Sequence, residues 1–214
     1  MNEPDKVGER FFQKARFLTT AAQWKDLPET RLEVAFAGRS NAGKSTAINT
    51  LVNQKRLAYA SKTPGRTQQI NFFQVEESGT LVDLPGYGYA EVPLAVKRHW
   101  QAFLSRYLAD RQVLLGLVVL MDIRHPLTEL DQQLLSWYQA RQTPLLVLLS
   151  KADKLSRSEQ FQTTQAVKKD INWDEDRVKV LAFSSVTRQG LMEARSCLMG
   201  WMGVKPIEVG SDAL

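Results

Sequence analysis

The stretch Gly38-Arg39-Ser40-Asn41-Ala42-Gly43-Lys44-Ser45 follows an apolar run, Glu33–Ala37, and opens an amphipathic segment, Lys44–Asn53. Its spacing is that of a G-x-x-x-x-G-K-[ST] loop, which binds phosphate groups between a strand and a helix. The glycines let backbone N–H groups turn toward phosphate oxygens, and the positive end of the helix adds to the attraction. Lys44 would contact the β- and γ-phosphates, and the Ser45 hydroxyl would ligate Mg²⁺. The stretch therefore predicts a nucleotide site that uses all eight residues.

Segments of strand and helix character alternate along the rest of the chain. Short apolar runs indicate strands at Glu33–Ala37, Gln69–Val75, Thr80–Asp83, Leu114–Met121, Pro144–Leu149 and Val178–Phe183. Longer amphipathic segments indicate helices at Lys44–Asn53, Pro93–Ala109, Glu129–Arg141, Ser158–Ile171 and Gly190–Trp201. A short polar loop joins the second and third strands and predicts a hairpin, whereas helices separate the others and predict parallel pairing. We therefore expect an α/β fold of three layers, with a mostly parallel six-stranded sheet that contains one antiparallel hairpin strand.

Length and composition predict a simple organisation. A chain of 214 residues is long enough for one substantial domain, and no repeat, low-complexity tract or linker divides it. We expect an N-terminal arm packed on the domain at residues 1–30, the nucleotide-binding domain at 31–204 and a short C-terminal tail at 205–214. Cys197 is the only cysteine, which excludes a disulfide-stabilised framework.

Hydropathy and charge limit the expected location and partners of the protein. The longest apolar run, Val113–Met121, has about half the length that a membrane-spanning helix needs, and the charged N-terminus does not resemble a signal peptide. We therefore expect a cytoplasmic monomer that does not associate with membranes. The net charge of +5 is compatible with an RNA partner but does not identify one.

A second motif, Asp83-Leu84-Pro85-Gly86, ends the strand that begins at Thr80. A carboxylate at this position can hold Mg²⁺ through water, and the Gly86 amide can contact the γ-phosphate. Asp-x-x-Gly alone is a common turn. After a phosphate-binding loop, on the third expected strand, it indicates the part of a nucleotide site that senses Mg²⁺ and the γ-phosphate.

Two further segments predict which base is bound. Ser150-Lys151-Ala152-Asp153 follows an apolar strand, at the sheet edge where nucleotides bind in α/β proteins. The Asp153 carboxylate can accept from N1–H and N2–H₂ of guanine, and adenine has no such pair of donors. The Lys151 stem can cover the base, and Phe183-Ser184-Ser185 can present backbone amides to guanine O6. An isolated Lys-x-Asp is often a solvated turn, and an ATPase of the same fold is the alternative; the order of all four motifs favours guanine.

Together these motifs resemble the EngB/YihA/YsxC family of bacterial ribosome-biogenesis GTP-binding proteins, within the translation-factor-related P-loop GTPases. The resemblance extends from Phe11 to Trp201. It rests on four stretches: Phe36-Ala37-Gly38-Arg39-Ser40-Asn41, Ser61-Lys62-Thr63-Pro64-Gly65-Arg66-Thr67-Gln68, Asp83-Leu84-Pro85-Gly86-Tyr87-Gly88-Tyr89-Ala90 and Asp122-Ile123-Arg124-His125-Pro126.

The resemblance implies a function and further site residues. Thr67 would ligate Mg²⁺ directly when GTP is bound, within a loop that closes over the phosphates and consists of Gly65, Arg66, Thr67, Gln68 and Gln69. The polar, aperiodic stretch 55–68 agrees with such a loop, while Thr63, before Pro64, suits a turn. The implied function is GTP hydrolysis as a switch in assembly of the large ribosomal subunit, with rRNA and ribosomal proteins as partners and a link to cell division and septation.

Three positions depart from related patterns or leave alternatives open. Ser150 stands where Asn or Thr is commoner, and it keeps a hydroxyl. Tyr87 stands where Ras-like GTPases carry a water-orienting glutamine, so we expect slow intrinsic hydrolysis and assign no general base. Asn41 either ligates an activating K⁺, as in related GTPases, or only caps the loop.

Two further questions stay open: the role of a basic segment and the function of the whole chain. The basic run Lys97-Arg98-His99-Trp100, with Arg106 and Arg111 nearby, is either a solvated helix face or a surface that contacts rRNA. The alternative function is a nucleotide-gated scaffold at the division site, in which hydrolysis is incidental.

Overall fold

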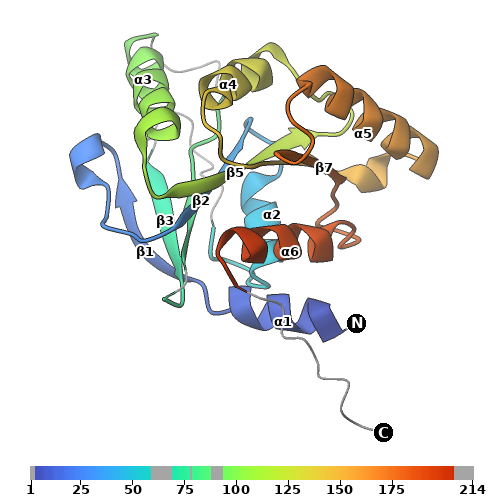
Figure 1. Cartoon of the computed structure of the whole chain (residues 1–214), viewed down its shortest axis with the longest axis horizontal. Helices are drawn as coiled ribbons and strands as arrows, with labels where there is room; N and C mark the ends of the chain where they lie inside the picture. The colour runs from blue at the N-terminus through green and yellow to red at the C-terminus, as the bar shows by residue number, and fades with distance from the viewer. Residues whose placement is uncertain (1–2, 59–68, 78, 88–93, 205–214) are drawn as a thin grey trace, which may run out of the picture.

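The computed structural model describes residues 3–58, 69–77, 79–87 and 94–204. Seven strands form one sheet in the order β1-β3-β4-β2-β5-β6-β7 (Figure 1). Their bounds are β1 Arg16–Ala21, β2 Glu33–Gly38, β3 Ile70–Val75, β4 Gly79–Asp83, β5 Leu114–Asp122, β6 Leu145–Ser150 and β7 Val178–Ala182. The pairs β1/β3 and β3/β4 are antiparallel, and the other four pairs are parallel. The sheet is therefore mostly parallel, with its antiparallel strands at one edge.

Helices cover both faces of this sheet (Figure 1). The helices are α1 Glu3–Phe12, α2 Lys44–Leu51, α3 Leu94–Asp110, α4 Glu129–Gln139, α5 Arg157–Ile171 and α6 Leu191–Trp201. One face carries α3, α4 and α5, and the other carries α1, α2 and α6. No helix in the described ranges is long and apolar enough to cross a membrane.

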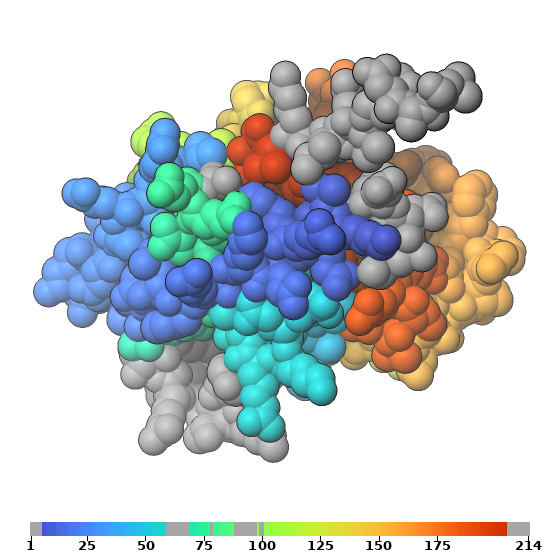
Figure 2. Space-filling model, turned by 90° about the horizontal axis from the view of Figure 1, so that it is seen from below, coloured from blue at the N-terminus to red at the C-terminus, as the bar shows by residue number. Residues whose placement is uncertain are grey.

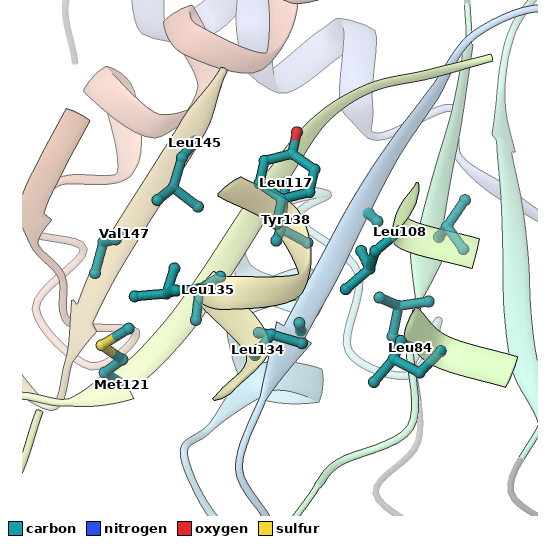
Figure 3. Packing of buried hydrophobic residues seen from close by; sticks show 14 of the residues in the cluster. Leu84, Leu108, Leu117, Met121, Leu134, Leu135, Tyr138, Leu145 and Val147 are labelled. Atoms are coloured by element: carbon teal, nitrogen blue, oxygen red, sulfur yellow. The ribbon is translucent and has the colours of Figure 1, made fainter. Parts of the chain in front are cut away.

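Alternation along the central strands divides the core between the two faces. In β5, Leu117, Val119 and Met121 belong to the cluster under α3 and α4, part of which Figure 3 shows, while Val118 and Leu120 belong to the cluster on the opposite face. All five side chains are at most 1% exposed. Burial on both faces explains why this strand is a continuous apolar run in the sequence.

The sheet has one strand more than the six that we expected. The additional strand is β1, an edge strand that pairs antiparallel with β3. Its register shifts between Phe17 and Thr19, and the neighbouring side chains of Phe17 and Leu18 are both exposed. Because this irregularity removes the alternation of buried and exposed residues, the sequence has no two-residue period here. The space-filling view in Figure 2 shows the N-terminal segments along the surface seen from below.

Candidate nucleotide-binding site

The carboxyl ends of the parallel strands bring the predicted motifs to one edge of the sheet. Gly38 ends β2, Asp83 ends β4 and Ser150 ends β6, while Phe183 directly follows β7. Phe36 of β2 is in register with Asp83 of β4, which places the first two motifs side by side. This edge is where open α/β sheets bind ligands.

The loop between β2 and α2 has the backbone that its glycines predict. A Cβ on Gly38 would lie 3.0 Å from the Leu120 carbonyl oxygen, so the strand end packs too closely for a side chain. Gly43 has φ +87°, a left-handed conformation that glycine adopts without strain. Asn41 is also left-handed, with φ 65°, and is exposed. The loop then leads directly into α2 at Lys44, so the first helical N–H groups face the space that the loop encloses.

Lys44 and Asp83 form an ion pair across this loop. The Lys44 side chain is 10% exposed and that of Asp83 is 4% exposed. A charge with so little access to water needs a partner of opposite charge, and here Lys44 and Asp83 are partners for each other. Phosphate groups entering the loop would compete with the carboxylate for the ammonium.

The donors near Lys44 fit a hard divalent cation. Ser45, half-buried in the first turn of α2, supplies a hydroxyl, and Asp83 supplies a carboxylate. Oxygen ligands of this kind, few in number and completed by water and phosphate, suit Mg²⁺. Within the part of the chain that the structure describes, no group of three or more His, Cys, Asp or Glu residues could hold a metal ion. The predicted ligand Thr67 lies outside the described residues, as do Gly65, Arg66 and Gln68, and Gln69 is exposed just before β3.

The segment after Asp83 lies against the phosphate-binding loop. The Tyr87 amide donates to the Gly38 carbonyl at 3.3 Å, and the Ser40 amide donates to the Tyr87 carbonyl at 3.0 Å. A Cβ on Gly86 would lie 3.4 Å from the Ser40 nitrogen. The backbones of Leu84, Pro85 and Gly86 are therefore held beside the loop that would contain the phosphates.

The Tyr87 side chain is engaged elsewhere. Its hydroxyl donates to Asp131 Oδ1 of α4 at 2.8 Å. Burial and the neighbouring Asp131 carboxylate raise the pKa of Tyr87 well above its usual value, so the phenol stays protonated and remains a donor. Asp131 itself caps α4 by accepting from the Thr128 amide and hydroxyl. Tyr87 is therefore anchored to α4.

Ser150 and Lys151 join the predicted base site to the phosphate-binding loop. The buried Ser150 hydroxyl lies 2.7 Å from the Ala42 carbonyl and 3.1 Å from the Met121 carbonyl. Lys151 has φ 59°, and its Nζ donates to the Asn41 carbonyl at 2.9 Å. The hydroxyl that Ser150 retains thus lies against the loop, and the Lys151 stem extends between the two parts of the site.

Asp153 is oriented from the loop that follows β7. Ser184 Oγ donates to Asp153 Oδ1 at 2.6 Å and accepts from the Val186 and Thr187 amides at 3.2 Å each. The hydrogen bond from Ser184 and, to a lesser extent, the neighbouring Lys154 ammonium lower the pKa of Asp153 below its usual value. The carboxylate is therefore ionised at neutral pH, the state that accepts two N–H donors.

The amides predicted to face the base are partly engaged within the protein. The Phe183 amide donates to the Leu149 carbonyl at 2.9 Å, and the Ser184 amide donates to the Gln189 carbonyl at 3.1 Å. These bonds position the loop that carries Ser185. Of the three predicted residues, Ser185 is the one whose amide we expect to meet the base.

Sequence reasoning missed a buried glutamine that connects the two base-site loops. Gln160 of α5 donates to the Ala152 carbonyl at 2.8 Å and to the Leu155 carbonyl at 3.0 Å, and it accepts from Gln189 at 2.7 Å. Nothing in the local sequence distinguishes this glutamine from the exposed polar residues of the same helix, because its partners come from other segments.

The basic residues after the Asp-x-x-Gly motif do not form one feature. Arg111 is ion-paired with the fully buried Glu33, and Arg106 lies 4.2 Å above the Trp24 ring. Arg98 is exposed. The side chains of Lys97, His99 and Trp100 lie outside what the structure describes. Arg111 therefore has a structural role at the other end of the sheet.

Proteins of a known family are similar to this chain over most of its length. A family model described as a 50S ribosome-binding GTPase matches residues 33–151. A probable GTP-binding protein EngB of Neisseria meningitidis serogroup B is 54% identical over 193 residues, which cover 89% of this chain and 92% of the relative. A probable GTP-binding protein EngB of Thiobacillus denitrificans is 55% identical over 189 residues, or 88% of this chain and 91% of the relative.

Solved structures agree in fold. A crystal structure of a probable GTP-binding protein EngB matches with a TM-score of 0.65 and 18% identity, over 81% of this chain and all of that one. Era, in a complex with MgGDPNP and nucleotides of 16S ribosomal RNA, matches with a TM-score of 0.61 and 16% identity, over 81% of this chain and 57% of that one. These likenesses confirm the P-loop GTPase fold. The family model and the sequence relatives show more: the chain is a GTPase and belongs to the EngB family of GTP-binding proteins.

Proposed function

We propose that the chain is a Mg²⁺-dependent GTP switch that hydrolyses GTP to GDP and phosphate during assembly of the large ribosomal subunit in the cytoplasm. The observation that carries the guanine part is the ionised Asp153 carboxylate, held by Ser184 at 2.6 Å while Lys151 connects the same site to the phosphate-binding loop. Guanine offers two adjacent N–H donors to such a carboxylate, and the Ser185 amide would donate to O6.

The phosphate side of the proposed site uses the loop backbone and Lys44. Lys44 would leave Asp83 for the β- and γ-phosphates, where its charge offsets the charge that develops in phosphoryl transfer. Bound Mg²⁺ would supply further charge neutralisation, with Ser45 and Thr67 as direct ligands and Asp83 acting through water. Gly86 would donate its amide to the γ-phosphate.

Slow intrinsic hydrolysis is part of the proposal. The Tyr87 hydroxyl donates a hydrogen bond to Asp131, which supports the expectation that Tyr87 does not orient the attacking water. No general base is assigned. Asn41, exposed in the phosphate-binding loop, is the candidate ligand for an activating K⁺, with a purely structural role in the loop as the alternative.

The ribosomal part of the proposal rests on relationship. The family model that matches residues 33–151 is described as a ribosome-binding GTPase, and Era is a structural neighbour solved with ribosomal RNA. We propose that the GTP-bound chain docks as a monomer on rRNA and proteins of the large subunit and leaves after hydrolysis. A requirement in cell division and septation would then follow from ribosome supply.

Sedimentation and turnover experiments test this function. We expect the protein to sediment with large subunits when a non-hydrolysable GTP analogue is present and to remain at the top of a sucrose gradient with GDP. GTP turnover should rise when purified large subunits are added, and should rise further in potassium than in sodium if Asn41 ligates K⁺. Absence of co-sedimentation in every nucleotide state would contradict the ribosomal function.

A nucleotide-gated scaffold at the division site is the second candidate, because the engaged Tyr87 hydroxyl is compatible with a site where binding matters more than hydrolysis. It predicts that a hydrolysis-deficient but GTP-binding variant still supports septation.

An ATPase is tested by titration with labelled GDP and ADP: equal affinities would contradict the role of Asp153.

A further inference from the structure

Asp122, the last residue of β5, lies beside the predicted base site; it begins one of the four stretches that carry the family resemblance, but it has no assigned role in nucleotide binding. Its carboxylate is 18% exposed and accepts from Arg124 three times: from the backbone amide at 3.1 Å, from Nε at 2.9 Å and from Nη2 at 2.6 Å. The Lys151 Nζ lies 3.0 Å from Oδ2 of the same carboxylate. Asp122 therefore connects the residue predicted to cover the base with an arginine in the loop that follows β5.

The sheet register determines this contact. Asp122 is in register with Ser150, the residue immediately before Lys151, on the neighbouring parallel strand. Lys151 leaves β6 in a left-handed conformation, and its ammonium reaches both the Asn41 carbonyl and the Asp122 carboxylate. The two acceptors hold the end of the side chain from two different segments, the phosphate-binding loop and β5.

Most ion pairs at a protein surface contribute little free energy, because water screens the charges and holding two flexible side chains in one geometry costs entropy. Here the Arg124 guanidinium binds both carboxylate oxygens, so the carboxylate orientation is fixed before Lys151 is considered. Arg124 also lowers the pKa of Asp122, which keeps the charge in place at neutral pH. The Lys151 side chain is still 36% exposed, and a free lysine has many rotamers to lose.

We propose that Asp122 is a positioning residue for nucleotide binding: it holds the Lys151 ammonium so that the lysine stem is already extended over the base slot before the nucleotide arrives. This inference rests on the proposed guanine site. Organising the lysine in advance lowers the entropy that binding must otherwise offset. Because Lys151 would contact the face of the base, the effect is the same for GDP and GTP and does not depend on the base edge that Asp153 reads.

The experiment measures dissociation of fluorescently labelled GDP and GTP by stopped flow, using the full chain with Mg²⁺. We expect Asp122→Asn to accelerate dissociation of both nucleotides by the same factor, about three- to tenfold. Asp110→Asn is the matched control, since it removes an equal charge from an exposed pair with Arg106, and it should leave both rates unchanged. An effect of Asp122→Asn on GTP alone would overturn the proposal, because it would indicate action at the phosphates.

A double-mutant cycle separates positioning from general stability. Lys151→Met keeps the apolar stem and removes the ammonium with both of its contacts, so it should accelerate release at least as much as Asp122→Asn does. Adding Asp122→Asn to Lys151→Met should then have no further effect. If the two factors multiply, Asp122 does not act through Lys151 and the proposal is wrong. Melting temperatures of all four proteins, measured without nucleotide, show whether a change in release follows from partial unfolding, which the proposal excludes.

The failure of the proposed function would look different. If the unmodified chain does not bind labelled GDP, the guanine site itself is wrong. If it binds GDP and the cycle is multiplicative, only the role of Asp122 fails. A further arm uses Asp153→Asn with xanthosine diphosphate: adding Asp122→Asn there should accelerate release by the same factor as it does for GDP in the unmodified chain.

Discussion

Buried carboxylates lie near the two ends of β2, in contrasting surroundings. At the amino end, the fully buried Glu33 accepts from the Tyr107 hydroxyl at 2.7 Å, from Arg111 at 2.6 Å and from Thr30. Near the carboxyl end, beside the phosphate-binding loop, Asp83 of the adjacent β4 is paired with Lys44 alone among the described residues. One carboxylate is surrounded by protein donors, while the other keeps lone pairs that a ligand or its cation can use.

This difference distinguishes a charge that the protein itself satisfies from one that is available to a ligand. A buried carboxylate whose lone pairs are all taken by protein donors stabilises the native arrangement and has nothing left to offer a ligand. A carboxylate with a single lysine partner can exchange that partner without rebuilding the fold. Substitutions at the amino end should therefore change folding stability, and substitutions at the carboxyl end should change nucleotide chemistry.

The largest effect is expected for Arg111→Met at the amino end. Removing the guanidinium leaves the Glu33 charge buried and unpaired, which should lower the free energy of unfolding by about 3–5 kcal/mol. Urea unfolding measures this loss. Release of labelled GDP from the folded fraction should not change, and a comparable loss of GDP affinity in folded protein would contradict the separation of the two ends.

Asp153→Asn should produce the next largest effect, at the carboxyl end. The amide cannot accept from both guanine N–H donors, so GTP affinity should fall about 100-fold, while affinity for xanthosine triphosphate should rise. Competition titration measures both. The free energy of unfolding should change by less than about 0.5 kcal/mol, because the introduced amide oxygen still accepts from Ser184. Unchanged preference for GTP would refute the assignment.

Tyr107→Phe tests the amino end more gently. The hydroxyl donates to a buried charge, so its loss should cost about 2 kcal/mol of stability at about pH 8. Burial raises the pKa of Tyr107 well above its usual 10.0, so the folded chain keeps a proton that the unfolded chain loses above that pH. Stability of the unmodified chain should therefore fall as pH rises past about 10, and the Phe variant should fall less steeply. Parallel curves for the two proteins would argue against this proton linkage.

Ser184→Ala should have the smallest effect. It removes the donor that orients Asp153, so GDP release should accelerate about threefold. The free energy of unfolding should fall by about 1 kcal/mol, because the Val186 and Thr187 amides also lose an acceptor. Ser184 helps to hold the pKa of Asp153 below its usual 3.8, so the carboxylate of the unmodified chain stays ionised and GDP affinity should be flat from about pH 8 to about pH 5. In the Ala variant the loss of affinity on acidification should begin at a higher pH. Identical pH profiles would show that Ser184 does not affect the ionisation of this group.

Much of the site was predictable because each motif is local. The phosphate-binding loop needs glycines at positions where the backbone turns left-handed or packs against β5, and these requirements are written in eight consecutive residues. Lys151 and Asp153 follow directly from the end of an apolar strand. The order of these segments along the chain was sufficient to predict an α/β fold and a family, both of which the comparisons confirm.

Other features could not be predicted, because they join segments that are distant in the sequence. β1 was missed because a register shift exposes two successive apolar residues and removes the strand period. Gln160 looks like any polar residue of an amphipathic helix until two loops close over it. Tyr87 was predicted from the sequence to replace a glutamine, but its environment depends on Asp131 of α4, which is distant in the sequence.

By itself, then, the sequence predicted the local chemistry: which residues could meet phosphate and guanine, on which strand ends, in which order. Only the tertiary structure decided which charges are free to use that chemistry. Glu33 and Asp83 both lie at strand ends in the sequence, but their roles differ because the sheet brings Arg111, Tyr107 and Thr30 to one and Lys44 to the other. The physical reason is that a buried charge takes its function from the donors that surround it, and those donors come from across the whole fold.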